Sequence, residues 1–317
     1  MSSRRQSKSI KLLIISVLGI PCIASAEPPL ATIQVADMIR SIPARTRQAL
    51  TGSEFVKYIS KMDSQQREQA ILSELLDGNL PSFLRKLVPL ELKQVLANGK
   101  TLSATIFVMP EYLAIGSDND FLRIPMNLYT ATAVAARFRF VLPTKKVVDA
   151  IYDQSSYHFV PEPMTPGPQM RSTDYYRVHN EMIDKQSLAR GIPIGALVSG
   201  HKKDVVITNR PTLSQGRIAI YGWHRRSGAP IQPLSTVHGA GYADYSHGIR
   251  LVSEVALLDG KIRSIYDILQ DSLLANVLSD EGSISILRDL GPAHLPSGTA
   301  AGSLGLGQLL SRGQLIR

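Results

Sequence analysis

Apolar residues in the first part of the chain recur three and four positions apart between about residues 31 and 98, a spacing that predicts helices. Thr51 and Glu54 have the spacing of a capping box, in which each side chain bonds a free backbone N–H at the start of a helix. Further helices are expected over 63–78 and, between two prolines, over 81–89. No chemically active residues gather in this region, so we interpret it as a helical packing region.

From residue 103 onward, short apolar runs separated by turns replace the helical pattern. The run 103–109 reads as a buried strand, and the proline-rich stretch 155–172 as a loop that precedes a polar helix. The fold class predicted is therefore α+β, with an N-terminal helical region followed by a mixed, mainly antiparallel sheet with flanking helices. The other elements expected are helices over 130–137, 143–152 and 263–279, and strands over 196–198, 204–208, 217–221 and 249–252.

The first 26 residues have the three parts of a secretory signal peptide. Four cations precede an apolar run over 12–23, and Ala24-Ser25-Ala26 supplies a small-residue cleavage site. The apolar run is too short to span a bilayer as a helix, and no later stretch is long enough. We expect an exported protein, periplasmic or secreted, without an integral membrane segment after cleavage. The division predicted is a signal peptide (1–26), a helical N-terminal region (27–100), an α+β domain (101–290) with a His-rich segment (199–251), and a flexible tail (291–317).

Removal of this signal would change the chemistry open to the chain. Cys22 is the only cysteine, so cleavage excludes a disulfide framework, a thiolate zinc site and a cysteine nucleophile. The full chain has 35 basic and 26 acidic side chains, and loss of the four leader cations leaves 31 and 26. No basic block or basic–aromatic interleaving is present, so no nucleic-acid partner is expected.

The candidate chemistry is concentrated in the His-rich segment, which holds four of the seven histidines. The polar residues there stand at the ends of predicted strands or in adjoining turns, where a rigid scaffold positions loop side chains. We predict that the catalytic candidates are His247, His238, Asp244, His201 and His224. The substrate-binding candidates are Arg250, Lys203, Tyr242, Tyr245 and Trp223.

One chemistry that suits these residues is metal-assisted hydrolysis. His238, Asp244 and His247 offer two imidazoles and a carboxylate, the ligand types of a zinc site that keeps one position open for water. Together with Ser235 and Gly241 this run resembles the ligand segment of the zinc D-alanyl-D-alanine peptidases, although two spacings differ by one residue. The resemblance covers about ten residues, and it implies zinc as the cofactor.

A second chemistry needs no metal. Ser246 precedes His247, and a nearby aspartate would orient the ring for acid–base or nucleophilic catalysis. The run 246–250, with an upstream His238-Gly239, also resembles the L,D-transpeptidases of the cell wall. That family's nucleophilic cysteine is missing here, so its reaction is not implied.

The predicted function is an exported hydrolase that acts on peptidoglycan, another cell-envelope polymer or a small-molecule substrate. The competing hypothesis is a non-catalytic envelope protein that binds a carbohydrate or peptide through aromatic residues. Each candidate residue also has a structural alternative. Arg250, between two apolar residues, would fit a buried ion pair, and Trp223 would fit the core.

Overall fold

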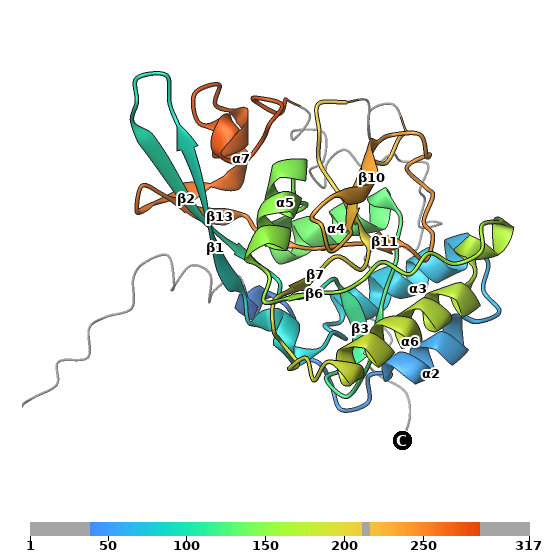
Figure 1. Cartoon of the computed structure of the whole chain (residues 1–317). Helices are drawn as coiled ribbons and strands as arrows, with labels where there is room; N and C mark the ends of the chain where they lie inside the picture. The colour runs from blue at the N-terminus through green and yellow to red at the C-terminus, as the bar shows by residue number, and fades with distance from the viewer. Residues whose placement is uncertain (1–38, 211–215, 286–317) are drawn as a thin grey trace, which may run out of the picture.

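A computed structural model describes residues 39–210 and 216–285 of the 317-residue chain. It confirms the α+β class, with helices around several mainly antiparallel sheets. Figure 1 shows a group of helices on one side of the molecule and a long hairpin extending on the other. The predicted signal peptide and the predicted tail lie outside the described residues.

The N-terminal helices form as their caps predict. Helix α2 (Gly52–Ile59) is capped at its N-terminus by Thr51, which forms a capping box with Glu54. Helix α3 (Ser64–Leu76) is capped by Asp63, whose side chain accepts a hydrogen bond from the backbone N–H of Gln66, the third residue of the helix. The third predicted helix is a 3₁₀ turn, η1 (Ser82–Arg85).

The helical prediction is wrong over residues 88–95. These residues form strand β1 (Val88–Val95), which pairs along its whole length with β2 (Thr101–Val108) as an antiparallel hairpin. Leu90 and Leu92 are buried, whereas Glu91 between them is exposed, so the local period is two rather than 3.6. A tight turn at Gly99, where φ is +79°, joins the strands.

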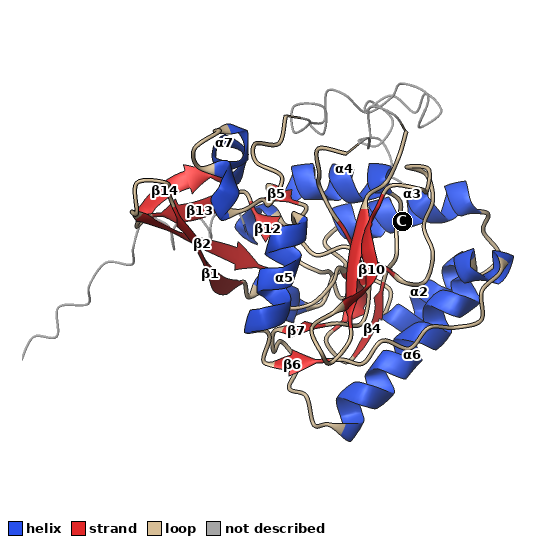
Figure 2. Ribbon diagram, turned by 45° about the horizontal axis from the view of Figure 1, so that its top comes forward, coloured by secondary structure: helices blue, strands red, loops and turns tan. Residues whose placement is uncertain are grey.

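The larger sheet has the order β14-β13-β2-β12-β5, with β1 paired to β2. Helix α5 (Lys145–Gln154) contacts β1 of this sheet and β9 of a second one, and Figure 2 shows it between them. Helix α4 (Leu128–Phe138) leads directly into β5. The remaining strands of this sheet are β5 (Phe140–Val141), β12 (Val252–Ser253), β13 (Val255–Leu258) and β14 (Lys261–Ser264).

The second sheet has the order β10-β9-β8-β11, and all four of its strands come from the His-rich segment. Its first three strands are antiparallel, and β11 joins β8 in parallel. Two further sheets, β3–β4 and β6–β7, have two strands each. The strands are β3 (Ala114–Ser117), β4 (Asp120–Arg123), β6 (Tyr157–His158), β7 (Val198–Ser199), β8 (Lys203–Val205), β9 (Ile220–His224), β10 (Pro230–Ser235) and β11 (His247–Gly248).

One hydrophobic core joins the two regions that the sequence suggested. Its buried residues run from Ile42 to Ile284, so the expected boundary near residue 100 does not separate two cores. Within residues 39–210 and 216–285, no helix is both long and apolar enough to cross a membrane. The elements not yet placed are η2 (Pro168–Arg171), α6 (Thr173–Ala189), α7 (Ile265–Gln270) and η4 (Ala275–Val277).

Candidate functional site

The loop before β11 brings four of the predicted residues together. The rings of His238 and Tyr242 stack with centroids 4.1 Å apart and planes 8° apart. The Tyr242 hydroxyl donates to Oδ2 of Asp244 over 3.0 Å, and Nε2 of His247 lies 4.0 Å from the same oxygen. Lys203 stands beside His247, because β8 and β11 pair at these two residues. We call these five residues the His238 site.

Local backbone bonds explain why these side chains meet. Asp244 accepts from both the backbone N–H and the hydroxyl of Ser246, at 2.8 and 2.6 Å, which closes a tight turn. His247 N–H donates to the Asp244 carbonyl over 3.1 Å, so the two side chains face each other three residues apart. Lys203 N–H donates to the Ser246 carbonyl over 2.7 Å and ties this turn to β8.

Burial divides the His238 site into two layers. His238, Tyr242 and Lys203 are half-buried, whereas Asp244 and His247 below them are 1% and 0% exposed. Within the described residues, neither ring nitrogen of His247 has a hydrogen-bond partner. A buried polar group without a partner costs about 1–3 kcal/mol, so such groups call for an explanation in function or bound solvent.

The charges of the site follow from that burial. Burial lowers the pKa of His247, and nearby Lys203 lowers it further against the opposing effect of Asp244, so this imidazole is neutral at neutral pH. Burial also lowers the pKa of His238. Burial acts to raise the pKa of Asp244, but His247 and the two bonds from Ser246 outweigh it, so the carboxylate keeps its charge. The site therefore holds two neutral bases beside a carboxylate.

The predicted zinc set is not assembled. In the part of the chain that the structure describes, no three His, Asp or Glu side chains are grouped so that they would hold a metal ion. The reason is local, since both Asp244 oxygens accept protein hydrogen bonds and the His238 ring lies flat on Tyr242. The combination of His238, Asp244 and His247 thus suits proton transfer better than metal ligation.

His201 was predicted to join this site, and the structure places it in a different cluster. Its Nε2 is 2.7 Å from Oε1 of Glu111, and its ring contacts Tyr112 and Phe159 edge-on. Glu111 also pairs with Arg123 over 2.8 Å, and both are about 4% exposed. Sequence reasoning missed Glu111 and Arg123, because a single acid after one strand and a single base at the end of another form no pattern.

His224 is also elsewhere. Its Nε2 lies 3.1 Å from Oδ1 of Asp149 on α5, and its ring stacks on Tyr152 at 4.5 Å. Asp149 accepts a further bond from the Tyr221 hydroxyl over 2.7 Å and pairs with Lys145 over 3.1 Å. These contacts join α5 to β9, so the position of His224 supports a structural role rather than the predicted catalytic one.

Three of the predicted substrate contacts are buried. Arg250 is 0% exposed, donates to the carbonyls of Met109 and Val198, and lies over the Tyr112 ring. Trp223 and Tyr245 are 4% and 1% exposed. Substrate contact by these three residues stays a prediction, and their burial favours the structural alternatives. Lys203 and Tyr242 remain within reach of a ligand.

Comparison with models of protein families, with curated proteins and with solved structures found no match for this chain. The resemblances to the D-alanyl-D-alanine peptidases and the L,D-transpeptidases are therefore limited to the few residues that carry them.

Proposed function

We propose that the protein is an exported hydrolase that cleaves an anionic cell-envelope polymer, such as peptidoglycan, by metal-independent acid–base catalysis at the His238 site. The observation that carries the proposal is the fully buried imidazole of His247, unpartnered among the described residues, beneath a half-exposed His238–Tyr242 pair. Among the described residues, His247 is the one side chain with two buried polar atoms that lack a hydrogen-bond partner. A site that handles protons and water has a use for such a group.

Each residue of the site takes a role that its surroundings favour. His238 is the half-exposed base: it takes a proton from water as the water oxygen bonds to the substrate, and returns that proton to the leaving atom as the scissile bond breaks. Asp244 orients Tyr242 by accepting a hydrogen bond from its hydroxyl. His247 is a second neutral acceptor beneath them. The pKa of Tyr242 is raised to about 12 by burial and by Asp244, so its hydroxyl stays a donor.

The rim of the site supports the choice of an anionic substrate. Lys203 is half-buried, with Nζ 5.3 Å from the centre of the Trp223 ring. The exposed Arg171 lies with its guanidinium carbon 5.4 Å from the centre of the Tyr242 ring. Two cations beside one buried carboxylate favour a negatively charged ligand. Export rests on residues 1–26 and a polymer substrate rests on export, so both are parts of the proposal.

The test is the release of soluble fragments from purified cell-wall material, followed by mass spectrometry. We expect His238→Ala to lower the rate about 100-fold, since general acid–base groups contribute 10²–10⁴-fold. His158→Ala is the matched control, because His158 is also half-buried beside a tyrosine but lies in β6. Equal rates for His238→Ala and the unaltered protein would refute the proposal, provided that both variants melt as the unaltered protein does.

The same assay has a pH signature. The base must be neutral to act, and the pKa of His238 is lowered by burial from its ordinary value near 6.5. The rate is therefore expected to fall with acidification only below pH 6.5, and a metal chelator should not change it. A rate that a chelator abolishes and zinc restores would contradict metal-independent catalysis.

The non-catalytic alternative keeps one supporting observation. The stacked, half-exposed rings of His238 and Tyr242 form a flat surface of the kind that binds sugar rings. The other aromatic residues suggested for this role, Trp223 and Tyr245, are buried. Binding of the polymer without release of fragments, weakened by Tyr242→Ala, would favour this alternative.

A further inference from the structure

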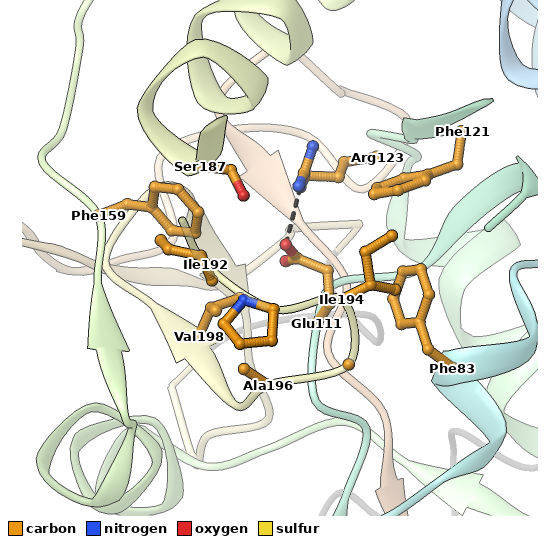
Figure 3. Close-up of a pocket in the computed structure, with 12 residues that line it drawn as sticks. Phe83, Glu111, Phe121, Arg123, Phe159, Ser187, Ile192, Ile194, Ala196 and Val198 are labelled. Carbon is orange, nitrogen blue, oxygen red and sulfur yellow. Dashed lines mark hydrogen bonds and ion pairs between the residues drawn. The ribbon is translucent and has the colours of Figure 1, made fainter. Parts of the chain in front are cut away.

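A small pocket opens beside the end of α6, away from the residues of the His238 site. It has a volume of about 40 Å³ and mostly apolar walls. Phe83 and Phe121 pack edge-to-face on one side with ring centres 5.2 Å apart, and Phe159 and Ile192 lie on another (Figure 3). A single water needs roughly 10–15 Å³ of such space, so the pocket has room for a group of about three heavy atoms.

The polar part of the lining is a buried ion pair. Figure 3 shows Glu111 among the apolar side chains, joined to Arg123. Nε of Arg123 donates to Oε2 of Glu111 over 2.8 Å, and Nη1 donates to Asn180 and Asp184 over 3.1 and 2.7 Å. The guanidinium also lies 4.8 Å from the centre of the Phe121 ring, which fixes its plane. These contacts hold the guanidinium in place without a ligand.

In the described part of the chain, some hydrogen-bond donors and acceptors of the Glu111–Arg123 pair have no partner. A guanidinium has five N–H donors, and within the described residues the Nη2 donors of Arg123 have no partner. Glu111 accepts from the Tyr112 backbone N–H, from His201 and from Arg123, which leaves about one of its four acceptor positions. The pocket therefore offers donors and one acceptor next to each other.

The charges of Glu111, Asp184 and Arg123 determine which kind of ligand fits the pocket. A carboxylate guest would add a third negative charge beside Glu111 and Asp184, and an ammonium guest would face Arg123. A neutral carboxamide avoids both, because its oxygen accepts from Nη2 while its N–H donates to the carboxylate. The three heavy atoms of the carboxamide group, one carbon, one oxygen and one nitrogen, match the volume, and the apolar walls suit the aliphatic carbon attached to the group.

We propose that this pocket is a binding site for a short aliphatic carboxamide, such as a glutamine or asparagine side chain or an amidated peptide carboxyl group. Two exposed apolar residues at the mouth of the pocket favour a carboxamide that is part of a larger molecule. The lining residue Ile194 is 62% exposed, and Leu188, which follows the lining residue Ser187, is 85% exposed. The site stands on its own residues and does not depend on the hydrolase proposed above.

The test is a titration with propanamide, followed by saturation-transfer difference NMR on the purified protein. We expect saturable binding with a Kd on the order of 1 mM, as befits five heavy atoms, and at least tenfold weaker binding of propanoate and propylammonium. Ala196→Leu fills the pocket without altering the ion pair and should raise the Kd at least tenfold. Ala189→Leu, an exposed position near the end of α6, is the matched control and should change nothing.

Three results would overturn the proposal. These are the absence of saturation by propanamide, an unchanged Kd in a folded Ala196→Leu variant, or propanoate binding as tightly as propanamide. The melting temperature of each variant shows whether it is folded. Because no polymer is hydrolysed in this experiment, its outcome is separate from that of the cell-wall assay.

Discussion

Replacement of Arg250 by alanine is expected to lower the free energy of unfolding by about 3–5 kcal/mol, the usual cost of removing one partner from a buried charged cluster. Its guanidinium donates to the carbonyls of Met109 and Val198 over 3.0 and 2.7 Å, and both acceptors would be left without these bonds in the interior. Arg250 also acts to lower the pKa of Glu111 and Asp204, two buried carboxyls that would lose a compensating cation.

Urea denaturation at pH 7, monitored by the fluorescence of Trp223, the only tryptophan, measures this change. Arg177→Ala is the matched control. Arg177 is also paired with acids, Asp174 and Glu181, but its side chain is 42% exposed on α6, so its loss should cost less than about 1 kcal/mol. Equal, small effects of the two variants would show that Arg250 is not a structural cation.

The N-terminal helices were predictable because the residues that cap them lie close together in the sequence. Two capping boxes mark where two helices start, and each involves residues only three positions apart: Thr51 with Glu54, and Asp63 with Gln66. Strand β1 was missed because Leu90 and Leu92 alternate over too short a run to outweigh the helical pattern before them. Its assignment depends on pairing with β2, which is tertiary information.

The same distinction applies to the candidate site. The residues 238–247 meet within one loop, so local density along the sequence was enough to find them. Glu111 contacts Arg123 and His201, which are 12 and 90 residues away, and no single-sequence pattern connects them. The sequence also offered no measure of burial, so Arg250 and Trp223 were grouped with the half-exposed Lys203 although they belong to the interior.

Raising the pH from 7 to 9 is expected to add about 2 kcal/mol to the free energy of unfolding through one side chain, Lys202. This lysine is 1% exposed, and its Nζ donates to the Tyr245 carbonyl over 2.7 Å and lies 3.4 Å from Nδ1 of His179. Burial, with a further contribution from Arg123, lowers the pKa of Lys202 to about 7, below the ordinary 10.5.

The sign follows from proton binding. Between pH 7 and 10.5 the unfolded chain keeps the Lys202 proton and the folded protein has lost it, so stability rises with pH by up to about 1.4 kcal/mol per unit. Below pH 7 both the folded and the unfolded protein hold the Lys202 proton, so the contribution of Lys202 to stability no longer changes with pH. The tyrosines with raised pKa, such as Tyr176, oppose the trend only above about pH 10, where the unfolded phenol ionises.

Urea unfolding of the unaltered protein and of Lys202→Met at pH 7, 8 and 9 tests this expectation. The variant should lose most of the rise, because methionine fills similar space without a titrating group. Lys203→Met is the matched control: burial lowers the pKa of Lys203 as well, but this side chain is half-exposed, so its share of the rise should be smaller. A rise that persists in Lys202→Met and disappears in Lys203→Met would instead assign the proton to the rim of the His238 site.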